Sequence, residues 1–260
     1  MIPVKPKKSL GQHFLTDKNI ARKIVNSLTG QHYGRILEVG PGMGVLTEIL
    51  LELPEKEMLF VEIDQYSVDY LKNRFPEIQN RIISADILSI PLTDLYHEPF
   101  AIIGNFPYNI SSQLFFKILD HRDLVIETVC MIQKEVAVRL ASPPGSRDYG
   151  ILSVLLQAFY NIEYLFTVPP QVFIPPPKVN SSVIRLKRNN TLKLACNEIL
   201  FKKVVKTAFN QRRKTLRNSL KSMLSDTNTS DSIWQKRPEQ LGVDEFVTLT
   251  RWIDKDPMAM

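Results

Sequence analysis

Short apolar runs alternate with helical patterns through the first two-thirds of the chain. Such alternation is typical of βαβ units, so it predicts an α/β fold with a parallel sheet. After a polar stretch at 187–195 the spacing of apolar residues is helical. We therefore expect a sheet domain over residues 1–188 and a small helical domain over residues 189–260. The runs expected as strands are 35–39, 58–61, 81–85, 100–103, 124–132 and 179–187.

Three of the expected strands end in a polar residue, namely Glu62, Asp86 and Asn105. In open α/β sheets, ligands bind at the carboxyl ends of the strands, where these side chains would lie close together. Each acid alone is compatible with a helix N-cap or an ordinary surface position. All three at one edge instead indicate a binding site.

The tetrapeptide Asn-Phe-Pro-Tyr at 105–108 directly follows a buried run. The Asn105 carboxamide and the Phe106 carbonyl offer two acceptors close together, and Pro107 stiffens the backbone that holds them. Tyr108 adds a flat ring. This combination suits a planar base with an exocyclic amino group, through two hydrogen bonds and stacking. An ordinary Asn-Pro turn after a strand has the same residues, so the motif alone leaves both interpretations open.

A glycine-rich turn, with glycines at 40, 42 and 44, joins the first expected strand to a helix. Glycine permits tight turns and the close approach of a ligand, but dinucleotide enzymes use a similar pattern. Glu62, about twenty residues on, can accept both hydroxyls of a ribose. Asp86 adds an acceptor for an adenine amino group, which favours S-adenosylmethionine over a dinucleotide. The Glu38 carboxylate and the Gly40 backbone would suit the cationic groups of that cofactor.

Basic residues cluster near the C-terminus, although the net charge of the chain is only +6. Eight lysines and arginines and no acid lie between Lys202 and Lys221, on or beside one helix expected over about 201–220. The cluster indicates a polyanionic partner, with a solvated helix face as the alternative. The residues expected to contact an RNA backbone are Arg212, Arg213, Lys214 and Arg217.

The composition excludes several other classes of protein. Cys130 and Cys196 are the only cysteines and lack metal-ligand spacing, so neither a disulfide scaffold nor a metal site is expected. No run is long enough for a membrane span, and the N-terminal lysines are not followed by an apolar segment. We therefore expect a cytoplasmic protein. Five prolines at 168–178 predict a rigid extended segment with Phe173 in its middle.

Motifs along nearly the whole chain resemble those of the ribosomal RNA adenine N6,N6-dimethyltransferases. They are Lys8–Leu15, Leu37–Thr47, Val61–Asp64, Gly104–Ser111, Gln133–Ala137, Pro144–Gly150, Phe173–Val179 and Phe209–Ser219. The resemblance implies a Rossmann-like sheet of the class I S-adenosylmethionine-dependent methyltransferases. Phe106 replaces a leucine that is common in the family, and this change keeps the backbone carbonyl.

The resemblance also implies roles for individual residues. Asn105, Phe106, Pro107 and Tyr108 form the catalytic motif, and Asn105 stands between the cofactor and the target base. Tyr108 and Phe173 would stack on that base, with core packing as the alternative for Phe173. The cofactor-binding residues are His13, Leu15, Glu38, Gly40, Gly42, Glu62, Ile63, Asp86, Ile87 and Asn105.

The branch of the family that the sequence most resembles dimethylates two adjacent adenines near the 3′ end of 16S rRNA, in the immature small ribosomal subunit. This implies a monomeric enzyme with a role in ribosome biogenesis. The alternatives are a large-subunit rRNA methyltransferase of the macrolide-resistance type and a small-subunit assembly factor. DNA adenine methylation is disfavoured because no sizeable additional domain is present to read duplex sequence.

Overall fold

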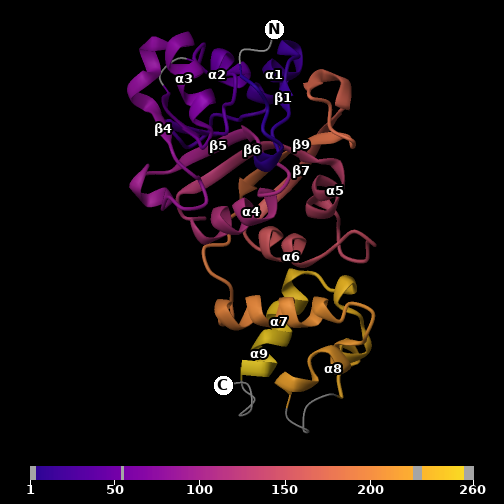
Figure 1. Cartoon of the computed structure of the whole chain (residues 1–260). Coiled ribbons are helices and arrows are strands. Elements are labelled where there is room, and N and C mark those ends of the chain that lie inside the picture. Colours follow the sequence, from indigo (N-terminus) through magenta and orange to yellow (C-terminus); the bar gives the residue numbers. More distant parts are fainter. Residues whose placement is uncertain (1–3, 54–55, 225–229, 255–260) are drawn as a thin grey trace. The chain divides into compact units, whose positions relative to one another are not determined.

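The chain is described by a computed structural model that covers residues 4–53, 56–224 and 230–254. It divides into two compact units (Figure 1). The sheet unit contains residues up to 137 together with 161–188, and the helical unit contains 138–160 together with the residues from 189 onward. The segment 138–160, which the sequence analysis assigned to the first domain, therefore groups with the C-terminal helices. It does so because α6 (Ile151–Gln157) packs on α7 (Glu198–Asn210) and α9 (Val243–Asp254).

A seven-stranded sheet forms the centre of the sheet unit, in the order β4-β3-β2-β5-β6-β9-β7. The first five strands in that order run parallel, and β9 is antiparallel to β6. The predicted α/β fold with a parallel sheet is confirmed. The strands are β2 (Arg35–Val39), β3 (Glu57–Glu62), β4 (Ile82–Ser84), β5 (Phe100–Asn105), β6 (Val125–Gln133), β7 (Tyr160–Val168) and β9 (Ser181–Arg188).

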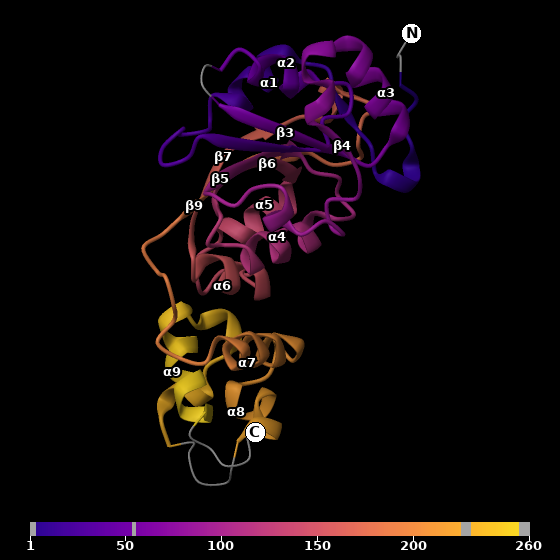
Figure 2. The same cartoon turned by 90° about the vertical axis from the view of Figure 1, so that its left-hand side faces the viewer.

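Helices cover both faces of this sheet (Figure 2). One face carries α1 (Lys18–Val25), α2 (Val45–Leu50) and α3 (Gln65–Arg74), and the other carries α4 (Ser111–Asp120). Aspartates cap two of these helices, because Asp17 accepts N–H groups at the start of α1 and Asp64 does so for α3. A further helix, α5 (Lys134–Ala141), follows β6.

The strand register brings the polar strand ends together. Val39 pairs with Val61, and Glu62 pairs with Ser84, so the chain leaves β2, β3 and β4 at the same edge. On the other side of β2, Glu38 pairs with Ile103 of β5, two residues before Asn105. This edge holds the glycine turn, Glu62 and Asn105, as the strand pattern predicted.

Three strands were not expected from the sequence. Strand β7 follows α6 and forms the edge of the sheet beside β9. A separate two-stranded sheet pairs β1 (Phe14–Leu15) with β8 (Phe173–Ile174), with Leu15 opposite Phe173. The predicted extended conformation of the proline-rich segment is therefore confirmed only in part, because the 3₁₀ turn Pro170–Val172 interrupts it before β8. Strand β8 pairs with the chain that precedes α1.

The helical unit corrects the prediction of one continuous helix over about 201–220. The helix α7 ends at Asn210, and α8 (Leu216–Ser219) begins after an intervening turn. Residues 210–215 are all polar, so no apolar side chain anchors another helical turn there. The Arg212 side chain instead donates to the carbonyls of Ser146 and Arg147.

No helix in the described part of the chain is long and apolar enough to cross a membrane. In the same residues, no group of three or more histidine, cysteine or acidic side chains has an arrangement that could hold a metal ion.

Candidate active site

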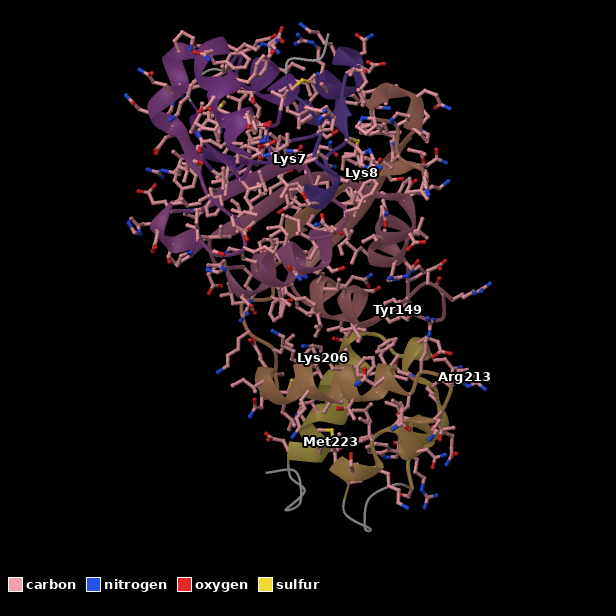
Figure 3. The ribbon with its side chains drawn as sticks, viewed as in Figure 1. Lys7, Lys8, Tyr149, Lys206, Arg213 and Met223 are labelled. Atoms are coloured by element: carbon pink, nitrogen blue, oxygen red, sulfur yellow. The ribbon has the colours of Figure 1, made fainter. Side chains whose placement is uncertain are left out.

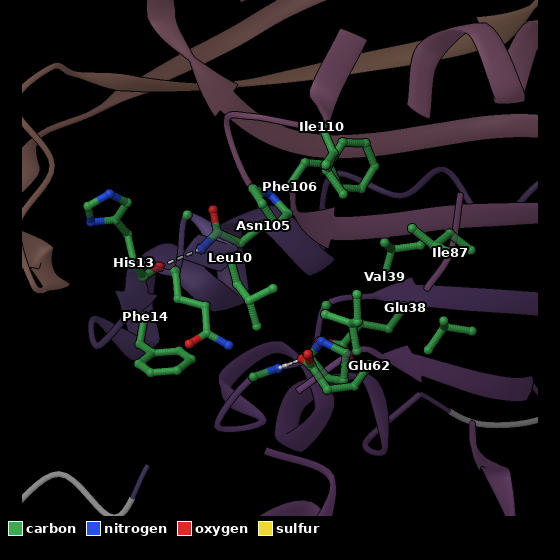
Figure 4. Close-up of a pocket in the computed structure, with 18 of the residues that line it drawn as sticks. Leu10, His13, Phe14, Glu38, Val39, Glu62, Ile87, Asn105, Phe106 and Ile110 are labelled. Carbon is green, nitrogen blue, oxygen red and sulfur yellow. Dashed lines mark hydrogen bonds between the residues drawn. The ribbon is translucent and has the colours of Figure 1, made fainter. Parts of the chain in front are cut away.

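A cavity of about 250 Å³ lies at the carboxyl edge of the sheet (Figure 4). Its lining comes from five segments, within 10–15, 38–46, 61–63, 85–87 and 105–110. Every residue predicted for catalysis or cofactor binding lines this cavity. These residues are His13, Leu15, Glu38, Gly40, Gly42, Glu62, Ile63, Asp86, Ile87, Asn105, Phe106, Pro107 and Tyr108.

The glycine turn has a backbone conformation that other residues rarely adopt. Gly42 has a φ of 56°, and a Cβ placed there would lie 2.9 Å from the ring of Phe14. Its N–H donates to the Glu62 carboxylate at 2.9 Å. A side chain at this position would therefore strain the turn and push away the segment that covers the cavity.

Glu62 is held rigidly at the end of β3. One carboxylate oxygen accepts the Gly42 N–H, and the other accepts the Asp64 N–H at 2.9 Å. Burial raises the pKa of Glu62, and these backbone hydrogen bonds oppose the shift. Each oxygen keeps a lone pair for a further donor, so the side chain is preorganised to accept hydroxyl groups from a ligand.

Glu38 is a second buried carboxyl group in the same cavity, with 1% of its surface exposed. Its Oε2 accepts from the Thr47 hydroxyl at 2.7 Å, while its Oε1 has no hydrogen-bond partner among the described residues. Burial raises the pKa of Glu38 to about 8, with a smaller contribution from the charge of Glu62. An unpartnered oxygen beside a second carboxyl group favours a cationic ligand.

Asp86 lies in the turn that follows β4. One of its carboxylate oxygens accepts the Leu88 N–H at 2.9 Å, which leaves the other oxygen for a ligand. Ile63 is half exposed and Ile87 is buried, and both line the cavity. Together these residues offer apolar surface and one acceptor, which is what a purine ring with an amino group requires.

The Asn105 side chain has a defined orientation. Its Nδ2 donates to the backbone carbonyl of His13 at 2.8 Å, and since a carbonyl only accepts, the amide oxygen must face away from it (Figure 4). The Pro107 carbonyl accepts the Ile110 N–H at 3.2 Å. The Phe106 carbonyl is therefore the better candidate for the second acceptor.

His13 and Tyr108 flank this motif. The His13 Nδ1 lies 2.7 Å from the Pro175 carbonyl, so Nδ1 carries the hydrogen and the ring acts as a donor there. The centroids of the two rings are 5.6 Å apart. The Tyr108 hydroxyl lies 2.7 Å from the Ser181 hydroxyl, and burial raises its pKa.

Phe173 does not line the cavity. It is 2% exposed, belongs to the main hydrophobic core and pairs with Leu15. This position agrees with core packing, the alternative that the sequence left open. A stacking role remains a prediction, and it would require the Phe173 side chain to turn out of the core.

Three residues beside the cavity, Lys7, Gln12 and Asp64, were not predicted as part of the site. The buried Asp64 carboxylate accepts from Lys7 Nζ at 2.6 Å and from Gln12 Nε2 at 3.0 Å. The hydrogen bonds from Lys7, Gln12 and the Tyr66 N–H hold the pKa of Asp64 below its ordinary value, against the effect of burial. An aspartate before a helix signals an N-cap, but no sequence pattern links it to a lysine 57 residues earlier.

The four basic residues predicted to contact RNA belong to the helical unit. Arg213, Lys214 and Arg217 are exposed (Arg213 is labelled in Figure 3). Arg212 differs, because it bonds to two backbone carbonyls and lies 3.8 Å from Glu239. It therefore has an intramolecular structural role, although no acid is near it in sequence.

Known structures share this architecture. A dimethyladenosine transferase from Plasmodium falciparum matches with a TM-score of 0.79 at 25% identity, covering 94% of this chain and 98% of that chain. The 23S rRNA methyltransferase ErmE matches with a TM-score of 0.66 at 24% identity, covering 93% and 100%. With the sheet order and the cavity at its carboxyl edge, these matches define a class I methyltransferase fold.

Sequence relatives identify the family. The chain belongs to the ribosomal RNA adenine dimethylase family, whose profile matches residues 4–255. The "Ribosomal RNA small subunit methyltransferase A" of Parabacteroides distasonis is 55% identical over 249 residues, which are 95% of this chain and 93% of the relative. The fold and the family inferred from the sequence are both confirmed.

Proposed function

We propose that this protein transfers methyl groups from S-adenosylmethionine to the N6 amino groups of two adjacent adenines near the 3′ end of 16S rRNA, giving N6,N6-dimethyladenosine. The observation that carries the proposal is the fixed amide of Asn105, which turns its acceptor oxygen away from His13 in a cavity with three acidic side chains. Relatives named as small-subunit rRNA methyltransferases support the choice of substrate.

The chemistry of the cavity fits S-adenosylmethionine. The unpartnered oxygen of Glu38 suits a cationic group, Glu62 can accept the ribose hydroxyls, and Asp86 can accept the adenine amino group. A Cβ placed on Gly40 would meet only the Asn105 carbonyl, at 3.9 Å, so the glycine turn leaves space for a ligand at that residue. When bound, this cofactor supplies an electrophilic methyl group on a sulfonium.

The target amine is a weak nucleophile because its lone pair is delocalised into the adenine ring. Acceptors on both of its N–H bonds, from the Asn105 amide oxygen and the Phe106 carbonyl, would favour a pyramidal nitrogen. They would also direct its lone pair at the methyl group, and the amine proton would leave after transfer. Catalysis would then depend on positioning and electrostatics, without a strong general base.

Recognition of RNA would involve the helical unit, through the exposed Arg213, Lys214 and Arg217. Tyr108 would stack on the flipped target base. We further propose that the protein acts as a monomer, on the immature small subunit in the cytoplasm.

The test uses tritiated cofactor with unmethylated small subunits, large subunits and DNA as parallel acceptors. Label in small-subunit RNA that digests to N6,N6-dimethyladenosine is the expected result. Label confined to large subunits or DNA would overturn the substrate assignment. Binding to small subunits without methyl transfer would instead favour an assembly factor.

A further inference from the structure

The segment Lys7–His13 forms a compact turn over the cavity. The Lys7 N–H donates to Oε1 of Gln12 at 2.8 Å, and Gly11, in the left-handed conformation, closes the short 3₁₀ turn Lys8–Leu10. One side chain thus ties the two ends of the turn together. We therefore expect the segment to move as one unit, so that a displacement of Lys7 or Gln12 also displaces His13.

This segment is attached on both sides of the cavity, and the His13 ring in addition donates to the Pro175 carbonyl. On the β3 side, Lys7 and Gln12 donate to the carboxylate of Asp64, and the Lys7 ammonium also lies 4.7 Å from the centre of the Tyr66 ring. On the β5 side, the carbonyl of His13 accepts from Asn105. Asp64 follows β3 and caps α3, whereas Asn105 is the last residue of β5.

We propose that Lys7, Gln12 and Asp64 form a latch that positions the catalytic amide of Asn105 through the backbone of His13. The latch would act on the methyl-transfer reaction of the proposed function, on which the inference rests. These three are positioning residues, since their contacts are with the segment and not with the reacting atoms.

The physical reason lies in the near-symmetry of a carboxamide. A half-turn about its terminal torsion exchanges oxygen and nitrogen at little steric cost. With the His13 carbonyl in place, only one orientation makes a hydrogen bond, and it presents the oxygen to an incoming amine. Without that carbonyl, the amide would sample the flipped orientation, in which an N–H group faces the N–H of the target and repels it.

Asp64 is suited to anchor such a latch because it is buried and hydrogen-bonded to two neighbouring elements. It is 1% exposed, caps α3 through the Tyr66 N–H, and donates its own N–H to Glu62. The carboxylate that holds the segment is thus two residues away from the carboxylate predicted to hold the cofactor ribose.

The experiment compares Lys7→Met with Lys8→Met. Both remove one positive charge from the same segment, but the exposed Lys8 side chain makes no hydrogen bond or ion pair with the described residues (both lysines are labelled in Figure 3). Lys7→Arg tests whether a cation of another shape restores the latch. Asp64→Asn breaks the ion pair while keeping a residue that caps helices well.

The first measurement is the single-turnover rate of methylation of small subunits at saturating cofactor. Lys7→Met and Asp64→Asn should lower it about tenfold, because small displacements of a positioned group are costly. Lys7→Arg should recover part of the rate, and Lys8→Met should match the unmodified protein. If the latch only closes the cofactor site, Lys7→Met and Asp64→Asn should raise the dissociation constant of the cofactor but keep a normal rate at saturating cofactor. That result would overturn the proposal.

The second measurement needs no activity. In nitrogen-15 NMR spectra, the side-chain amide protons of Asn105 should exchange with water faster in Lys7→Met than in Lys8→Met. Equal exchange in the two variants would refute the latch even if the enzyme methylates its substrate. Conversely, faster exchange with no methylation by the unmodified protein would support the latch and refute the proposed function.

Discussion

The Tyr108 hydroxyl lies 2.7 Å from the hydroxyl of Ser181, which joins the catalytic motif to the start of β9. Ser181 is fully buried and lies outside the cavity lining, whereas Tyr108 lines the cavity. The hydrogen bond holds the ring at its outer end, and the centroid of the His13 ring lies 5.6 Å from that of Tyr108. This arrangement allows two contributions of one side chain to be tested separately, namely the hydrogen bond of the hydroxyl and the stacking proposed for the ring.

We expect Tyr108→Phe and Tyr108→Ala to differ strongly. The phenylalanine variant loses one hydrogen bond, worth about 1 kcal/mol, so its single-turnover rate should fall at most about fivefold. The alanine variant also loses base stacking of about 1–3 kcal/mol, so its rate should fall by a further factor of about 5 to 160. Equal rates in the two variants would contradict a stacking role.

Asn105→Ala should nearly abolish methyl transfer while weakening cofactor binding only modestly, because the amide acts on the amine. Asn105→Asp is the matched variant, since it keeps an acceptor but cannot donate to the His13 carbonyl. It should also be severely impaired. Calorimetric titration with cofactor, beside a single-turnover assay, measures the two effects separately. Near-normal turnover in Asn105→Ala would rule out the proposed role.

Glu62→Ala should act first on cofactor affinity. Hydrogen bonds to a charged group contribute about 1.5–3 kcal/mol, so the dissociation constant should rise about tenfold to a hundredfold. The same change leaves the Gly42 and Asp64 N–H groups without their acceptor, so the melting temperature should also fall. Glu62→Gln keeps the side-chain volume and separates the two effects. An unchanged dissociation constant in a folded variant would show that the ribose is held elsewhere.

The carboxyl edge of the sheet was predictable because parallel strands must end together, and Glu62, Asp86 and Asn105 each follow one of these strands. Contacts between segments that are far apart along the chain could not be predicted from the sequence. The Lys7–Asp64 pair, the Tyr108–Ser181 hydrogen bond and the burial of Phe173 all depend on where the chain crosses the cavity. The break before α8 was missed for a related reason, since Arg212 finds its partners on a distant loop.

Cofactor affinity should depend on pH through Glu38. Burial raises its pKa from 4.5 to about 8, so below pH 8 the empty cavity holds a proton that a cationic ligand must displace. Affinity should therefore rise with pH up to about 8 and then level off.

The stability of the free protein should depend on pH through the same residue. The raised pKa of Glu38 stabilises the free protein most fully below pH 4.5, and this contribution is lost as the pH rises through 8. In Glu38→Gln, both dependences should become shallower, as titration calorimetry and thermal melting across pH would measure.

The exposed cations of the helical unit should set RNA affinity without altering the chemistry. Replacement of Arg213, Lys214 and Arg217 by glutamine should weaken binding to small subunits. The slope of log binding constant against log salt concentration should become shallower by about 0.7–0.9 for each phosphate group that the variant no longer neutralises. Cofactor affinity should not change, because all three residues lie outside the cavity lining.

Two variants serve as controls for this prediction. Replacement of the exposed Lys5, Lys8 and Lys72 by glutamine removes the same charge from the sheet unit and should leave the salt slope unchanged. Arg212→Gln should lower the melting temperature and affect the slope less, because Arg212 already bonds to the carbonyls of Ser146 and Arg147. Filter binding at several salt concentrations measures the slopes. If the first triple variant folds normally and keeps the original slope, these cations form a solvated surface and the RNA is bound elsewhere.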